Sequence, residues 1–176
     1  ILKLTPIGVF CLISKTFYSH GIQSILPLTE YFFTVVLALV LHLFITYGSL
    51  LHIFSKTNIL KFINKIAPAL LFAFSTSSSS ASIPMTIKVI QEKLNISSTV
   101  SSFVIPLGAT INMDGTAIMQ GVATVFLANV FNIDISFSGY LIIIAMATLA
   151  SIGAAGVPSA GLITLAMVLQ QVGIDE

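Results

Sequence analysis

Asp114 is the only acidic residue in the stretch 95–133, and no lysine or arginine lies within twenty positions of it. If this stretch lies in a membrane, the charge costs about 2.5–3.5 kcal/mol and marks a functional site. A bound cation would offset that cost, because further oxygen ligands follow closely in the sequence. These are the Asn112 amide, the hydroxyls of Thr110 and Thr116, and carbonyls near Gly108 and Gly115. The alternative is a protonated, hydrogen-bonded aspartic acid with a structural role.

A second kind of site is indicated by the segment 75–82, which reads STSSSSAS. At a helix N-terminus, serine hydroxyls and unpaired backbone N–H groups attract an anion. The alternative is that these small residues only allow helices to pack closely. The segment 151–161, SIGAAGVPSAG, is equally small and contains Gly153, Gly156 and Gly161. Such a backbone suits a gate that opens and closes, and a packed turn is the alternative.

The two small-residue segments share a pattern, since 81–84 reads ASIP and 155–158 reads AGVP. Proline is favoured at the first position of a helix. We therefore expect each tip to start a half-helix whose N-terminus lies deep in the bilayer. Two such N-termini, converging, could hold a carboxylate without an arginine.

The amino-acid composition indicates whether these elements lie in water or in a membrane. Of the 176 residues, 56% are hydrophobic and 7% are charged, with a net charge of +1 and no arginine. Soluble domains carry about 25% charged residues, so a soluble globular protein is excluded. The chain is too apolar to be disordered and has no basic stripe for nucleic acid. An integral membrane protein remains.

The positions of the charges divide the chain into membrane elements. The 25 uncharged residues 31–55 predict a complete transmembrane helix, and 4–18 predicts an earlier one, so that 1–54 holds two transmembrane helices, partly of a scaffold. Five lysines, which favour the cytoplasmic side, bracket the segment 60–94. They are Lys56, Lys61, Lys65, Lys88 and Lys93.

Because both ends of 60–94 carry lysines and its middle is serine-rich, we expect an inner re-entrant hairpin there. The residues 97–131 predict a transmembrane helix broken near Asp114. The residues 139–173 predict an outer re-entrant hairpin that enters from the opposite side. The predicted fold class is therefore all-α integral membrane, with two opposed re-entrant helical hairpins forming an inverted repeat. A final transmembrane helix is expected beyond residue 176.

Other polar residues have less prominent roles in this interpretation. His42 and His52 are expected to be interfacial or helix-packing residues rather than ligands. A serine hydrolase would need a base near the serine run, and an aspartyl mechanism would need two intramembrane carboxylates. We therefore expect no enzymatic activity.

Three motifs, in order, carry a family resemblance: the serine-rich hairpin, LGATINMDGTA at 107–117, and ASIGAAGVPSAG at 150–161. Together they resemble the dicarboxylate/amino acid:cation symporter family, which includes the glutamate and aspartate transporters. The resemblance implies symport of an acidic amino acid or C4-dicarboxylate with Na⁺ or H⁺, without other cofactors. It also implies a homotrimer of full-length chains in a lipid bilayer, here a bacterial inner membrane. The alternative is a fragment, truncated at both ends, that cannot transport.

The resemblance also implies roles for matching residues. Cation ligation falls to Gly108, Thr110, Asn112, Asp114, Ser151 and Ile152. Substrate binding falls to Ser78, Ser79, Thr116, Gly156 and Val157. Cation binding at Asp114 would favour closure of the 151–161 gate over substrate, and the hairpin domain would move like an elevator against the scaffold.

The chain departs from the family pattern at two informative positions. Ser77 stands where some archaeal members have an arginine, and the resemblance places a substitute arginine in the helix beyond residue 176. Gln120 stands where vertebrate excitatory transporters have a proton-carrying glutamate. The resemblance therefore argues against a proton–potassium cycle.

Overall fold

The computed structural model describes residues 25–171 and 173, together with residues 8, 10, 11, 13–15 and 18. All regular structure in this part is helical, and it contains no strand. The all-α fold class is therefore confirmed. The predicted first transmembrane helix, 4–18, and the turn after it lie largely outside the described residues.

One long helix contains the predicted span 31–55. It consists of α2 (Ile25–Leu41), the π-helical segment η3 (His42–Tyr47) and α3 (Gly48–Ser55). It ends where Lys56 takes a left-handed conformation, with φ 52°. The part Pro27–Ser55 has 29 residues and contains an 18-residue window with a mean hydropathy of 2.1. At about 1.5 Å per residue it is about 44 Å long, which exceeds the thickness of a bilayer core.

The serine-rich segment forms the turn of a helical hairpin. Helix α4 (Ile59–Thr76) begins after Asn58, whose side chain accepts from the backbone N–H groups of Leu60 and Lys61. It ends at Ser77, where φ is 49°, and α5 (Ser79–Leu94) follows. By length and composition α4 is also apolar enough to cross a membrane.

A helix starts at the serine-rich tip, but Pro84 is not its first residue. Helix α5 begins at Ser79, because the Ser78 side chain accepts a hydrogen bond from the backbone N–H of Ala81 and caps the first turn. Pro84 lies inside α5, where its missing N–H leaves the Ser80 carbonyl without its helical donor. Pro158 likewise does not begin a helix, since α9 begins two residues later, at Ala160.

The stretch around Asp114 forms two helices in line. Helix α6 (Ser98–Ile111) contains Pro106, and α7 (Asp114–Val130) begins after a two-residue break at Asn112 and Met113. The second hairpin follows as α8 (Phe137–Gly153) and α9 (Ala160–Gln171), joined by the residues 154–159.

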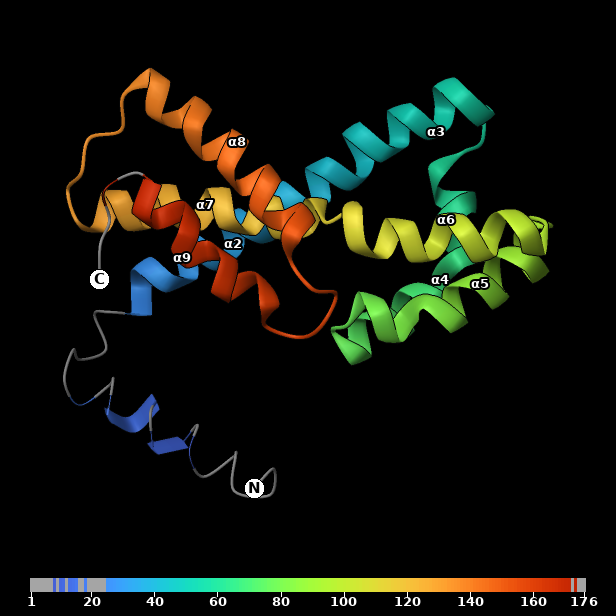
Figure 1. Cartoon of the computed structure of the whole chain (residues 1–176), viewed down its shortest axis with the longest axis horizontal. Coiled ribbons are helices and arrows are strands. Elements are labelled where there is room, and N and C mark those ends of the chain that lie inside the picture. The colour runs from blue at the N-terminus through green and yellow to red at the C-terminus, as the bar shows by residue number, and fades with distance from the viewer. Residues whose placement is uncertain are drawn as a thin grey trace.

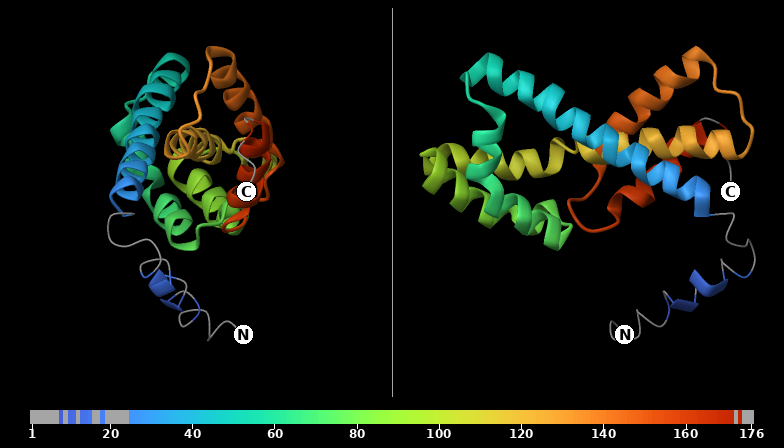
Figure 2. Two further views of the ribbon diagram at one scale, coloured as in Figure 1. Left: turned by 90° about the vertical axis from the view of Figure 1, so that its left-hand side faces the viewer. Right: turned by 180° about the vertical axis from the view of Figure 1, so that it is seen from behind.

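The two hairpins lie at opposite ends of the broken helix (Figure 1). Helix α5 packs along α6, and both α8 and α9 pack along α7, against which α2 also lies (Figure 2). The buried apolar side chains are mostly small, which allows close helix packing: Ala69, Ala123, Ala128, Ala147 and Ala154. Large side chains such as Phe54 and Phe74, 84% and 87% exposed, point outward instead. This distribution is the reverse of a soluble core and suits a lipid environment.

Candidate functional site

The tips of the two hairpins meet beside the break in the α6–α7 helix. The Gly156 carbonyl accepts a hydrogen bond from the Ser80 backbone N–H (3.0 Å) and another from the Ser78 hydroxyl (2.8 Å). A Cβ atom at Gly156 would lie 2.7 Å from Ser80 Oγ, 3.2 Å from Ser79 Cβ and 3.2 Å from the Ala109 carbonyl oxygen of α6. The close approach of three elements therefore requires glycine at this position.

A cavity of about 220 Å³ lies between the tips and the break. Of the predicted substrate residues, Ser79, Thr116, Gly156 and Val157 line it. Ser78 does not, because its side chain caps α5 and its hydroxyl binds the Gly156 carbonyl. The volume is below the usual range for drug-sized ligands, so the cavity suits a small molecule.

Three helix N-termini border this cavity. Ser77 and Ser79 bring the start of α5, Met113 and Thr116 the start of α7, and Ser159 and Gly161 the start of α9. Each N-terminus carries partial positive charge from its helix dipole, although at α5 the Ser80 and Ala81 N–H groups already donate to the Gly156 carbonyl and the Ser78 hydroxyl. No charged side chain occurs among the described residues of the lining. The arrangement therefore favours an anion held by backbone and hydroxyl groups.

Gln120 connects α7 to the second arm of the outer hairpin. Its side chain is fully buried, and Nε2 donates to the Gly161 carbonyl (3.1 Å) and to the Thr164 hydroxyl (2.5 Å). Its Oε1 atom has no hydrogen-bond partner in the described structure. The sequence identified Gln120 only as a departure from a family pattern, and the structure adds this link to α9.

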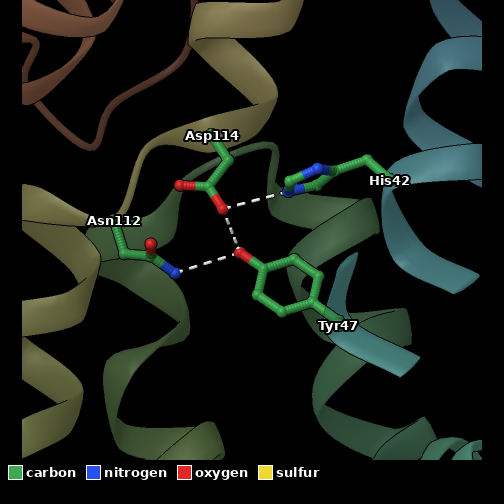
Figure 3. A network of polar contacts seen from close by, with 4 residues as sticks. All are labelled: His42, Tyr47, Asn112 and Asp114. Carbon is green, nitrogen blue, oxygen red and sulfur yellow. Dashed lines mark hydrogen bonds and ion pairs between the residues drawn. The ribbon is translucent and has the colours of Figure 1, made fainter. Parts of the chain in front are cut away.

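Asp114 lies in a network of polar contacts between the break and the long helix (Figure 3). Its Oδ2 atom accepts hydrogen bonds from His42 Nε2 (3.1 Å) and from the Tyr47 hydroxyl. Asn112 Nδ2 donates to the same Tyr47 oxygen (3.1 Å). Asp114 also lies in the first turn of α7, where the helix dipole favours its negative charge.

His42 packs against the broken helix, where it contacts Asp114, and the sequence did not predict this contact. The sequence could not pair residues 72 positions apart, and Tyr47 was not identified at all. One signal was available for His42. An ionisable residue in the middle of an apolar span is by default a functional candidate.

The other predicted cation ligands make local contacts. The Thr110 hydroxyl donates to the Leu107 carbonyl (2.9 Å), and the Gly108 carbonyl accepts from the Asn112 backbone N–H (2.9 Å). Ser151 is buried and donates to the Thr148 carbonyl (2.8 Å). Ile152 is half-exposed. Gly108 and Thr110 lie on α6, Ser151 and Ile152 lie on α8, and these two helices pack against each other.

Among the described residues no group of three or more His, Cys, Asp or Glu side chains could hold a metal ion. A hard monovalent cation would depend on the Asp114 carboxylate with amide, hydroxyl and carbonyl oxygens.

An all-helical fold with apolar helices and a polar cavity among helix N-termini is typical of a membrane transporter. The model of the sodium:dicarboxylate symporter family matches residues 1–176, and the chain belongs to this family. The family that the three motifs indicate is thereby confirmed. It is a family of symporters, not of enzymes, and membership implies a multi-pass membrane protein.

The relatives described below are similar over 82% to 99% of the chain. The putative sodium-dependent excitatory amino acid transporter glt-4 of Caenorhabditis elegans is 39% identical over 99% of the chain and 35% of its own length. Excitatory amino acid transporter 1 of Ambystoma tigrinum is 41% identical over 99% of the chain and 32% of its own length. Excitatory amino acid transporter 5 of Mus musculus is 46% identical over 82% of the chain and 26% of its own length. The chain thus spans about a third of the curated relatives it matches.

Proposed function

We propose that the chain forms the substrate- and cation-binding part of a symporter that carries an acidic amino acid with sodium. The observation that carries the proposal is the convergence of three helix N-termini on a small cavity without a charged side chain. The relatives are named as excitatory amino acid transporters, one of them sodium-dependent, and these names support both the substrate and the cation. A C4-dicarboxylate and a proton are the alternatives that the experiment below separates.

The substrate site uses Ser79, Thr116, Gly156 and Val157 at the cavity wall. A carboxylate of the substrate lies at the starts of α5 and α9, where the helix dipoles stabilise its negative charge. Ser78 contributes by holding the outer tip in place through the Gly156 carbonyl. The two tips must be in contact to close the cavity, so this contact is the gate.

The cation site is centred on Asp114 and Asn112 at the break. In this proposal Gly108, Thr110, Ser151 and Ile152 contribute carbonyl and hydroxyl oxygens from the facing ends of α6 and α8. The cation offsets the carboxylate charge and stabilises the break next to the substrate cavity. Binding of the cation therefore favours binding of the anionic substrate.

The membrane arrangement is part of the same proposal. The two helical hairpins enter the bilayer from opposite sides, and hairpin plus following helix forms an inverted repeat. In the full-length protein three copies assemble, and the hairpin domain moves relative to a scaffold. The host is a cell membrane. The relatives named above are animal proteins and give no support for a bacterial inner membrane.

Equilibrium binding to the chain in lipid nanodiscs tests the proposal. Labelled aspartate is titrated in NaCl and in choline chloride, and unlabelled glutamate, succinate and fumarate compete. We expect saturable binding that requires sodium and is displaced by glutamate far better than by succinate or fumarate. Equal displacement by succinate would change the substrate class, and equal binding in choline chloride would contradict sodium coupling.

A further inference from the structure

We propose that Tyr47 and His42 are positioning residues that hold Asp114 in the cation-free protein, and that a cation binding Asp114 displaces the Tyr47 hydroxyl. The inference rests on the proposed function, because it takes Asp114 as the cation ligand. It adds a competing internal partner, supplied by the long helix, that must be removed before the cation site is complete.

The π-helical segment η3 brings the two side chains to the same place. His42 is its first residue and Tyr47 its last. In an ordinary α-helix, residues five positions apart point about 140° away from each other. The wider i→i+5 turn reduces this separation, and single π-helical turns are frequent at functional sites. The two rings are in edge-to-face contact, with centroids 5.0 Å apart.

The Tyr47 hydroxyl joins both sides of the break to the long helix (Figure 3). It donates to Asp114 Oδ2 on α7 and accepts from Asn112 Nδ2 in the break itself. One tyrosine therefore engages the two side chains on which the cation site is centred. In a lipid environment no water replaces a missing partner, so there each contact would satisfy a polar group that is otherwise unpaired.

The hydrogen-bond donors and a cation compete for the same lone pairs of the Asp114 carboxylate. A carboxylate has about four acceptor sites, two on each oxygen. His42 Nε2 and the Tyr47 hydroxyl both donate to the same oxygen, Oδ2. A cation that binds Oδ2 must therefore remove at least one donor. The Tyr47 hydroxyl is the one whose removal also frees Asn112.

Displacement of Tyr47 would change how the long helix is attached. Helix α2 packs against α7, with Leu39 close to Gly115, and would stay in place. Helix α3 diverges from the broken helix beyond η3 (Figure 2). Cation binding thus releases the long helix at the point where it leaves the binding domain. Only molecules in which these internal hydrogen bonds are broken can bind the cation. The apparent cation affinity is therefore the intrinsic affinity multiplied by the fraction of such molecules.

The test compares Tyr47→Phe with Tyr31→Phe in the whole chain in nanodiscs. Tyr31 lies on the same helix, and its ring contacts Phe126, so its variant controls for loss of a tyrosine hydroxyl. The first readout is the sodium concentration that gives half of the maximal thermal stabilisation, against choline chloride. We expect Tyr47→Phe to lower this concentration about tenfold, as loss of a hydrogen bond to a charged group predicts, and Tyr31→Phe to leave it unchanged.

Tyrosine fluorescence gives a second readout that does not depend on stability. The chain has four tyrosines and no tryptophan, and hydrogen bonding to a carboxylate quenches a tyrosine. Sodium should therefore increase the fluorescence of the unchanged chain and of Tyr31→Phe, but not of Tyr47→Phe. If Tyr47→Phe does not fold, His42→Phe removes the other donor and is expected to lower the sodium midpoint in the same way.

Two outcomes separate failure of this inference from failure of the proposed function. A sodium response that Tyr47→Phe weakens or leaves unchanged would overturn the displacement and make Tyr47 a ligand or a bystander, with the cation site intact. Absence of any sodium response in the unchanged chain would overturn both.

Discussion

Substitution of Gly156 by alanine tests the contact between the hairpin tips. The added Cβ would lie 2.7 Å from Ser80 Oγ, 3.2 Å from Ser79 Cβ and 3.2 Å from the Ala109 carbonyl oxygen. The Ser80 hydroxyl can rotate away, but the Ala109 backbone and the Ser79 Cβ cannot. The outer tip must therefore shift by a few tenths of an ångström from the inner tip and from α6.

The expected loss of substrate affinity follows from the two hydrogen bonds that the Gly156 carbonyl accepts, at 2.8 and 3.0 Å. Each contributes about 0.5–1.5 kcal/mol net, so their loss destabilises the closed arrangement by about 1–3 kcal/mol. If substrate requires that arrangement, its affinity falls between about fivefold and about a hundredfold.

The assay is equilibrium binding of labelled aspartate in NaCl, with Gly121→Ala as the matched control. A Cβ at Gly121 meets no atom within 4 Å, so this variant should bind as the unchanged chain does. Wild-type affinity in Gly156→Ala, or an equal loss in Gly121→Ala, would refute the reasoning that tip contact closes the cavity.

Three further predictions concern single side chains. Asp114→Asn keeps the shape of the side chain but removes its charge, so sodium should no longer increase the affinity for aspartate. Binding assays that still show the full sodium effect would exclude Asp114 as the cation ligand. Gln120→Leu removes both hydrogen bonds to α9 and should lower the free energy of unfolding by about 1–3 kcal/mol. Thermal denaturation in nanodiscs measures this change, and an unchanged melting temperature would contradict the link between α7 and α9. Ser78→Ala removes the cap of α5 and the contact to Gly156 and should lower the free energy of unfolding by about 1–2 kcal/mol. Hydrogen exchange should become faster at both tips. Faster exchange at α5 alone would show that the cap matters and the tip contact does not.

Local features of the fold were predictable because their causes are local. The uncharged residues 31–55 required a long helix in lipid, and that helix is present. The serines at 77–78 fall at the turn of a hairpin, where a serine side chain can cap the next helix. The exact first residue of α5 was not predictable from Pro84, because the Ser78 side-chain cap starts the helix five residues before the proline.

The contacts that assemble the site were not predictable in the same way. The approach of Ser78 to Gly156 joins residues 78 positions apart, and the pairing of His42 with Asp114 joins residues 72 apart. Both depend on how whole helices pack. The role of Tyr47 depends in addition on a π-helical turn, which hydrophobic periodicity does not reveal because the segment HLFITY is apolar like its flanks.

The central claim is that an anion at the helix N-termini and a cation at Asp114 bind together, and reciprocal linkage tests it most directly. Coupled sites must change each other's affinity by the same factor. Aspartate binding is measured at zero and saturating sodium, and sodium binding at zero and saturating aspartate, on the same preparation. We predict that both Kd values fall at least tenfold and by equal factors. Independent Kd values would contradict the claim.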